Sequence, residues 1–191
     1  NIPEGVLTIQ ANTFRECQSL GYPKLHDGII EIGDGAFSES DFRTQEIELP
    51  KSLKKIGNNA FWLAGGRFRH ADRTLMTSEE IKKLDLSNYK SPITAFETYK
   101  FPVALEEIGD LAFYQTFNGV ENFVFYENLK KVGRNAFLFR GENNFTFLGN
   151  KPEFVDIENG SNNPLSSEGK IRIKKSSTGW IGKLPDLPIE Y

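Results

Sequence analysis

A six-residue phrase, Ile-Gly followed by two variable residues and Ala-Phe, recurs along the chain and constrains its fold more than any other feature. Clear copies begin at Ile32, Ile56, Ile108 and, with valine first, at Val132, and a degenerate copy begins at Ile9. The phenylalanines of successive copies are 23, 24, 52 and 24 residues apart. A period of 23–24 residues is typical of solenoids, in which each unit is a coil too small to bury its own apolar side. The sequence therefore predicts a stack of coils.

The order of residue types within each unit predicts its local structure. A short strand-like stretch precedes the phrase, as in the alternating residues 122–125. We expect the glycine to occupy a turn with positive φ, and the Asp or Asn after it to cap a short helical turn that carries Ala-Phe. The phenylalanines should stack into a continuous spine, because each reaches only its neighbours in adjacent coils. These residues are Phe14, Phe37, Phe61, Phe113 and Phe137.

The repeat resembles the BspA-type leucine-rich repeats of bacterial cell-surface proteins, whose unit reads L-P-x-x-L-x-x-I-G-x-x-A-F-x-x-C-x-x-L. Residues 49–61 match its first part residue for residue, and residues 14–20 match its second part. The resemblance covers about residues 1–61 and 99–150, and Gln10 departs from it by replacing the glycine. It implies an α+β repeat, a leucine-rich-repeat-like β-solenoid of 23–24-residue coils with short helical turns. It also implies adhesion at a cell surface.

Departures from the period divide one predicted domain, residues 1–191, into four parts. Residues 1–61 are predicted to form regular coils, and residues 62–98 an irregular insertion followed by a compressed coil. Regular coils return over 99–147, and residues 148–191 are predicted to form a C-terminal cap that hides the spine from water. Because residue 1 falls inside a repeat, we expect a piece of a longer extracellular or cell-surface protein that lacks its signal peptide and upstream residues.

Two groups of residues are candidates for binding a partner. The insertion carries a cationic and aromatic cluster suited to a protein, a glycan or an anionic group, formed by Trp62, Arg67, Phe68, Arg69, His70 and Arg73. The alternative is structural, with Trp62 and Phe68 sealing the gap left by the compressed coil. The second group is an outward row on the predicted strands, formed by Lys24, Glu48, Lys100, Val124 and Thr146.

Charged pairs recur between the apolar positions of successive units. Strands of neighbouring coils lie about 4.8 Å apart, so Glu106-Glu107 and Lys130-Lys131 should form rungs of opposite charge. We interpret them as a solvated face with weak ion pairs rather than as a binding stripe.

Composition and motif content argue against several classes of function. With 23 basic and 26 acidic residues, the net charge of −3 does not fit a dedicated nucleic-acid binder. No apolar run approaches the roughly 20 residues of a membrane span. Cys17 is the single cysteine, expected to be a packed and inert thiol. With two histidines and no catalytic or metal-binding motif, we expect no enzyme, no catalytic residues, no metal and no cofactor.

Two functions of different classes remain open from the sequence. The first is a non-catalytic extracellular binding module of a bacterial surface protein. It would recognise a host or cell-surface protein, or a glycan, through the solenoid face and the 62–76 insertion. The second is a structural spacer or assembly unit within a larger surface protein. Neither nucleic acid nor membrane insertion of this segment is expected, and the sequence leaves the oligomeric state open.

Overall fold

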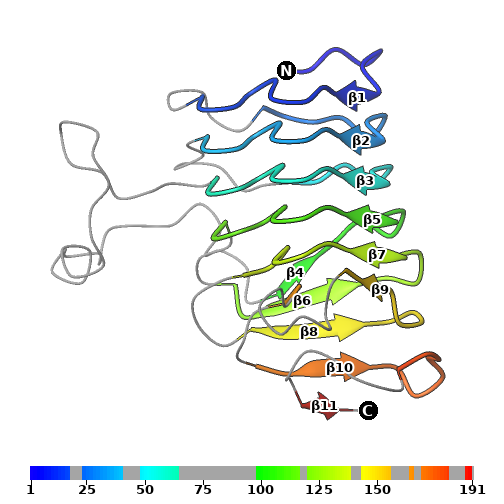
Figure 1. Cartoon of the computed structure of the whole chain (residues 1–191). Coiled ribbons are helices and arrows are strands. Elements are labelled where there is room, and N and C mark those ends of the chain that lie inside the picture. The colour runs from blue at the N-terminus through cyan, green and yellow to red at the C-terminus, as the bar shows by residue number, and fades with distance from the viewer. Residues whose placement is uncertain are drawn as a thin grey trace, which may run out of the picture.

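Stacked coils make up the described part of the chain, as Figure 1 shows. The computed structural model describes residues 1–17, 23–40, 48–64, 98–116, 120–138, 143–155, 164–165, 169–180 and 188–190. The first five of these ranges each contain one copy of the phrase, and we call them coils 1 to 5. Their strands pair in two parallel sheets that run along the stack, which confirms the predicted β-solenoid.

The first sheet takes one two-residue strand from the start of each of the five copies of the phrase, and a sixth from residues 153–154, which belong to no copy. Its strands are β1 (Thr8–Ile9), β2 (Glu31–Ile32), β3 (Lys55–Ile56), β5 (Glu107–Ile108), β7 (Lys131–Val132) and β9 (Glu153–Phe154). They pair in this order, parallel and in register. The first residue of the phrase in each coil is therefore buried in one row, whereas the residue before it lies on the outer side.

The second sheet takes the strands that precede the phrase in coils 4 and 5, and three more strands from residues after the last copy. Its strands are β4 (Thr98–Lys100), β6 (Asn122–Phe125), β8 (Asn144–Phe147), β10 (Ile171–Ile173) and β11 (Ile189–Glu190). In β6 and β8 buried residues alternate with half-buried ones, as the sequence of residues 122–125 predicted. Both phenylalanines of each of these two strands point into the core between the sheets.

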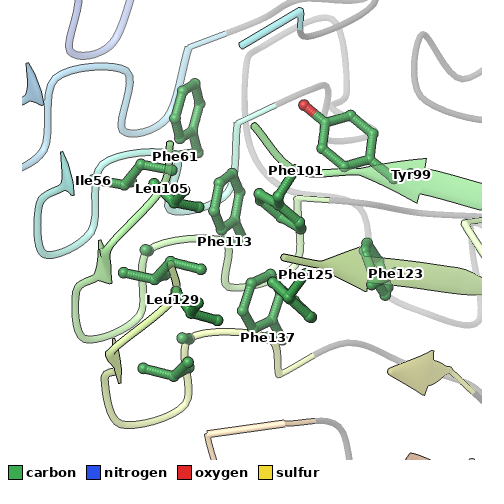
Figure 2. Packing of buried hydrophobic residues seen from close by; sticks show 14 of the residues in the cluster. Ile56, Phe61, Tyr99, Phe101, Leu105, Phe113, Phe123, Phe125, Leu129 and Phe137 are labelled. Carbon is green, nitrogen blue, oxygen red and sulfur yellow. The ribbon is translucent and has the colours of Figure 1, made fainter. Parts of the chain in front are cut away.

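The predicted phenylalanine spine is confirmed. Successive rings of the phrase stack with centroids 5.2, 5.1, 5.1 and 5.4 Å apart and with nearly parallel planes. A second stack lies beside it, in which Phe101, Phe125 and Phe147 are each 4.8 Å from the next (Figure 2 shows the first two). Stacking of aromatic rings at this distance is favourable, and the distance follows from the spacing between neighbouring coils. The core is thus a column of aromatic rings.

Coil 4 stacks directly on coil 3 in this column. Strand β3 pairs directly with β5, and the ring of Phe61 stacks directly on that of Phe113. A Cβ on Gly109 would lie 2.6 Å from the backbone nitrogen of Asn58, so no chain fits between coils 3 and 4 at this point. Of residues 62–98, the structure describes only 62–64 and Thr98. The boundaries of the four predicted parts stay predictions.

The glycine of the phrase is needed for a reason other than the predicted one. Positive φ falls two residues after it, for example at Gly35 and Asn59. The glycine itself packs against the preceding coil, and a Cβ on Gly133 would lie 2.4 Å from the backbone nitrogen of Asp110. Gln10 replaces this glycine in coil 1. Coil 1 is the first coil of the described stack, so within the described residues no preceding coil packs against this position.

The predicted short helical turns are not confirmed, since no helix occurs in the described ranges. Tandem turns follow the glycine of each phrase instead. Backbone N–H groups alternate between two kinds of acceptor. The Ala36 N–H donates to the carbonyl of Gly33 at 3.2 Å, whereas the next N–H, of Phe37, donates across to Ala60 of coil 3 at 2.7 Å. Every second residue therefore ties one coil to the next.

The Asp or Asn of the phrase caps the following coil rather than its own. Oδ1 of Asp34 accepts the backbone N–H of Asn58, Oδ1 of Asn58 accepts that of Asp110, and Oδ1 of Asp110 accepts that of Arg134. Each bond is 2.8 Å long. A continuous ladder of side-chain acceptors thus runs along the stack.

The C-terminal part covers the last described rings. Trp180 is buried, with its ring centroid 5.0 Å from that of Phe147 and 6.2 Å from that of Phe154.

Cys17 is half-buried rather than fully packed. None of the described residues belongs to a helix long and apolar enough to span a membrane.

Candidate partner-binding surface

The three charged residues predicted in the outward row lie around one hollow. Lys24 of coil 2, Glu48 of coil 3 and Lys100 of coil 4 all line a surface hollow of about 720 Å³, which we call the charged hollow. Lys100 continues in register to Val124 of β6 and Thr146 of β8. Stacking of successive coils therefore brings together charges that are 24 and 52 residues apart in sequence.

Salt bridging and hydrogen bonding hold part of the rim of the charged hollow. Oδ1 of Asp27 accepts the backbone N–H of Lys51 at 2.9 Å, and the Lys51 ammonium lies 3.6 Å from the other oxygen. The backbone hydrogen bond, more than the Lys51 charge, lowers the pKa of Asp27. The lining contains three lysines and two carboxylates, from Lys24, Lys51, Lys100, Asp27 and Glu48.

His26 and Tyr99 are held in the charged hollow by specific contacts. Nδ1 of His26 accepts the N–H of Gly28 at 3.0 Å, so Nε2 carries the proton and donates to the carbonyl of Pro3 at 2.9 Å. His26 thereby joins coil 2 to coil 1. Burial, and after it the negative charge of Glu48, raises the pKa of Tyr99, whose ring packs edge-on against Phe101. Tyr99 is therefore a neutral phenol.

The predicted opposite-charge rungs are confirmed on the first sheet. The Lys130 ammonium lies 2.5 Å from one oxygen of Glu106, and the Lys54 ammonium 3.7 Å from the other. Lys55 pairs with Glu31 at 3.1 Å. The hydrogen bond and charge of Lys130 lower the pKa of Glu106, and the hydrogen bond and charge of Glu31 raise that of Lys55. These charges are therefore matched within the chain.

Of the cluster predicted in the insertion, the structure describes only Trp62. Its ring stacks on Tyr114 of coil 4 with centroids 6.3 Å apart, and it lines a second hollow of about 460 Å³. The remaining members lie outside the described residues: Arg67, Phe68, Arg69, His70 and Arg73. Thr98, at which the described chain resumes, lines the charged hollow.

Sequence reasoning missed the second hollow, which we call the amide hollow. It is lined by Asn12, Arg15, Asp34, Gly35, Ser38, Asn58, Asn59 and Trp62. The residue after the phenylalanine of each phrase was the available signal, since it is large in coils 3 and 4 but is Ser38 in coil 2. Among the described residues, no group of three or more His, Cys, Asp or Glu side chains could hold a metal ion.

A parallel β-solenoid with this phrase in each coil defines a leucine-rich repeat protein. More narrowly, the chain belongs to the BspA-type leucine-rich repeat family. The family model described as BspA type leucine rich repeat region matches six copies, over residues 1–64 and 74–160. This confirms the resemblance inferred from the sequence.

Two solved structures are similar to this chain. They are a leucine-rich repeat protein from Bacteroides ovatus and the pneumococcal vaccine antigen PcpA, each 20% identical with a TM-score of 0.37. The matches cover 91% and 93% of this chain, but 48% and 56% of the other two. The chain therefore spans about half the length of those structures. A search of curated proteins finds no match.

Proposed function

We propose that the chain is a non-catalytic binding module of a bacterial surface protein, and that its partner is an extracellular or host-surface protein. The observation that carries the proposal is the convergence of Lys24, Glu48 and Lys100 on the charged hollow. Loops and rows of side chains on a rigid scaffold are the usual binding elements of such folds. The partner would contact this hollow together with the 62–76 segment.

The chemistry of the charged hollow fits a protein surface of mixed charge. Its lysines and carboxylates are interspersed, so a partner with alternating charges would find complementary groups, which gives specificity and faster association. The neutral hydroxyl of Tyr99 and the apolar Leu25 and Leu49 add an amphipathic floor. Aromatic and apolar groups at the centre of a polar rim are typical of protein interfaces.

A second function, that of a structural spacer, is favoured by a different observation. The phenylalanine rings stack without interruption from coil 1 to coil 5, and Asp and Asn side chains tie successive backbones together from coil 2 to coil 5. A column held together in this way resists bending. A spacer needs this rigidity but has no need of the charged hollow.

Retention on a panel of purified extracellular-matrix and host-surface proteins tests the proposal. The test variant carries Lys24→Ser, Glu48→Ser and Lys100→Ser. The matched control carries Lys54→Ser, Glu106→Ser and Lys130→Ser, which removes the same charges from the first sheet. A deletion of residues 64–76 is a third variant.

Binding should be lost in the test variant and weakened by the deletion, and the matched control should bind like the unaltered chain. Thermal unfolding of each variant separates loss of a contact from loss of the fold. Equal binding by the test variant and the control would refute the assignment of this face. No retention by any protein on the panel would favour the spacer.

A further inference from the structure

The amide hollow is built from one repeated position in three successive coils. Arg15, Ser38 and Trp62 each follow the phenylalanine of the phrase, in coils 1, 2 and 3. Coils repeat about every 4.8 Å, so the side chains of Arg15 and Trp62 begin roughly 10 Å apart. Between them stands only the small Ser38, with Gly35 beside it. The absence of a large side chain in coil 2 leaves a slot one coil wide.

An aromatic ring forms one wall of the slot. Trp62 stacks on Tyr114 toward coil 4, whereas the hollow is lined by residues of coils 1 to 3. Trp62 therefore lies between Tyr114 and the hollow. Stacking on Tyr114 fixes the orientation of this ring. A flat ring held in place offers its face to the apolar C–H groups of a ligand at little cost in side-chain entropy.

Side-chain amides form the rim. Oδ1 of Asn58 is engaged by the backbone N–H of Asp110, which leaves its NH₂ group as a donor. Oδ1 of Asp34 accepts the backbone N–H of Asn58, which leaves Oδ2 as an acceptor. In the described part of the chain, the side chains of Asn12 and Asn59 form no hydrogen bond. Donors and acceptors are thus mixed around the rim, as hydroxyl groups require.

The charge around the amide hollow selects against an anion. Its lining contains one cation, Arg15, and one carboxylate, that of Asp34, and Arg15 is already paired with Glu16 at 3.4 Å. Three asparagines therefore dominate its polar character. A volume of about 460 Å³ lies in the range of small-ligand sites. An uncharged ligand with several hydroxyls and one apolar face satisfies all of these groups.

We propose that the amide hollow binds a neutral saccharide, with one sugar ring stacked on Trp62 and its hydroxyls bonded to Asn12, Asn58, Asn59 and Asp34. This site shares no lining residue with the charged hollow, and Trp62 is its one residue in the 62–76 segment. Neutral hexose or N-acetylhexosamine residues have the required form, an apolar ring face with hydroxyls around its edge. Sialic acid and sulfated sugars do not fit, because the carboxylate of Asp34 would repel them.

Substitutions that occur naturally at equivalent positions provide variants that preserve the fold. Trp62→Ser introduces the residue that coil 2 has at this place, and Trp62→Tyr introduces the residue of coil 4. Asn12 and Asn59 have positive φ, as does Gly35 at the same position of coil 2, so Asn12→Gly and Asn59→Gly remove the amides without straining the backbone. These variants separate a lost ligand contact from a lost turn.

The probe is an array of immobilised glycans that end in galactose, mannose, N-acetylglucosamine, sialic acid or sulfated galactose, followed by fluorescence titration with the retained sugar. The chain has two tryptophans, and Trp180 is buried against Phe147. Saccharide should shift the emission of Trp62. Trp62→Ser should abolish the shift and weaken retention about tenfold, the value of a good ring contact. Trp62→Tyr should retain binding, and the double glycine variant should lose it.

Three results would overturn the proposal. They are the absence of any neutral glycan among those retained, retention of only the sialylated or sulfated glycans, and equal binding by Trp62→Ser. The triple variant of the charged hollow should bind saccharide like the unaltered chain. Its behaviour therefore distinguishes a failure of the saccharide site from a failure of the proposed protein-binding face.

Discussion

Replacing Gly133 with alanine should destabilise the solenoid by about 3–5 kcal/mol. The new Cβ would lie 2.4 Å from both the backbone nitrogen of Asp110 and the carbonyl carbon of Gly109. Both atoms belong to the backbone, so no side chain can rotate away and coils 4 and 5 must separate. Overpacking of this kind costs about 1–3 kcal/mol. Separation also weakens two bonds of 2.8 Å, from Gly133 N–H to Ile108 and from Arg134 N–H to Asp110, at about 1 kcal/mol each.

Urea denaturation followed by circular dichroism measures this cost. The urea concentration at the midpoint of unfolding should fall, while the dependence of the unfolding free energy on urea should not change. The reason is that Gly133→Ala and the unaltered chain expose the same surface on unfolding. Gly5→Ala is the matched control, since a Cβ there would meet nothing within 4 Å and should change stability by less than about 0.5 kcal/mol. If Gly133→Ala were as stable as the control, close approach of the backbones would not be the reason for the glycine.

Substitutions at three further positions test other parts of the stack. Phe113→Ala removes a fully buried ring from the spine and should lower the free energy of unfolding by about 3–5 kcal/mol, measured by urea denaturation. Asp110→Ala should cost about 1–2 kcal/mol because the N–H of Arg134 loses its acceptor, whereas Asp110→Asn should retain most of the stability. Lys130 lowers the pKa of Glu106 below its ordinary value of 4.5, so this carboxylate stabilises the fold above that pH and its contribution is lost as pH falls through the folded-state pKa. Thermal unfolding scans should therefore show a smaller loss of stability below pH 4.5 in Glu106→Gln.

The period of the repeat made the core predictable. Once the phrases are aligned, a solenoid has to place equivalent side chains above one another, so the phenylalanine spine and the charge rungs follow from spacing alone. The rungs of Glu106 and Lys130 needed no knowledge of side-chain rotamers. Long-range order in a solenoid is a repetition of one local arrangement, which explains why so much of this fold can be read from the sequence.

The role of the glycine could not be assigned in the same way. A glycine is needed both for positive φ and for close approach of backbones, and the sequence does not separate these needs. A clue lay two residues later, where Asn12, Gly35, Asn59 and Asn135 are residue types that tolerate positive φ, although Leu111 breaks the pattern. The Asp or Asn of the phrase was predicted to cap its own coil because a helical turn was expected there. In the structure it caps the next coil.

The sites depend on features that the repeat does not encode. The long step between Phe61 and Phe113 left open which residues stack on coil 3, and the direct contact of the two rings shows that coil 4 does. The charged hollow requires the same information, because it joins Lys100 to coils 2 and 3. The amide hollow arises from Ser38, a residue that attracts no notice until its neighbours in the stack are known.

Cysteine cross-linking tests the central claim, that residues about two dozen positions apart lie in register on one face. Val124 and Thr146 are paired positions of β6 and β8, and Arg172 is the partner of Thr146 one strand further on. Adjacent strands bring their Cα atoms within disulfide range. In a Cys17→Ser background, mild oxidation should cross-link Val124→Cys with Thr146→Cys rapidly, but leave Val124→Cys with Arg172→Cys reduced. Absence of the first cross-link, or equal rates for both pairs, would contradict the stacked register on which the fold and both sites depend.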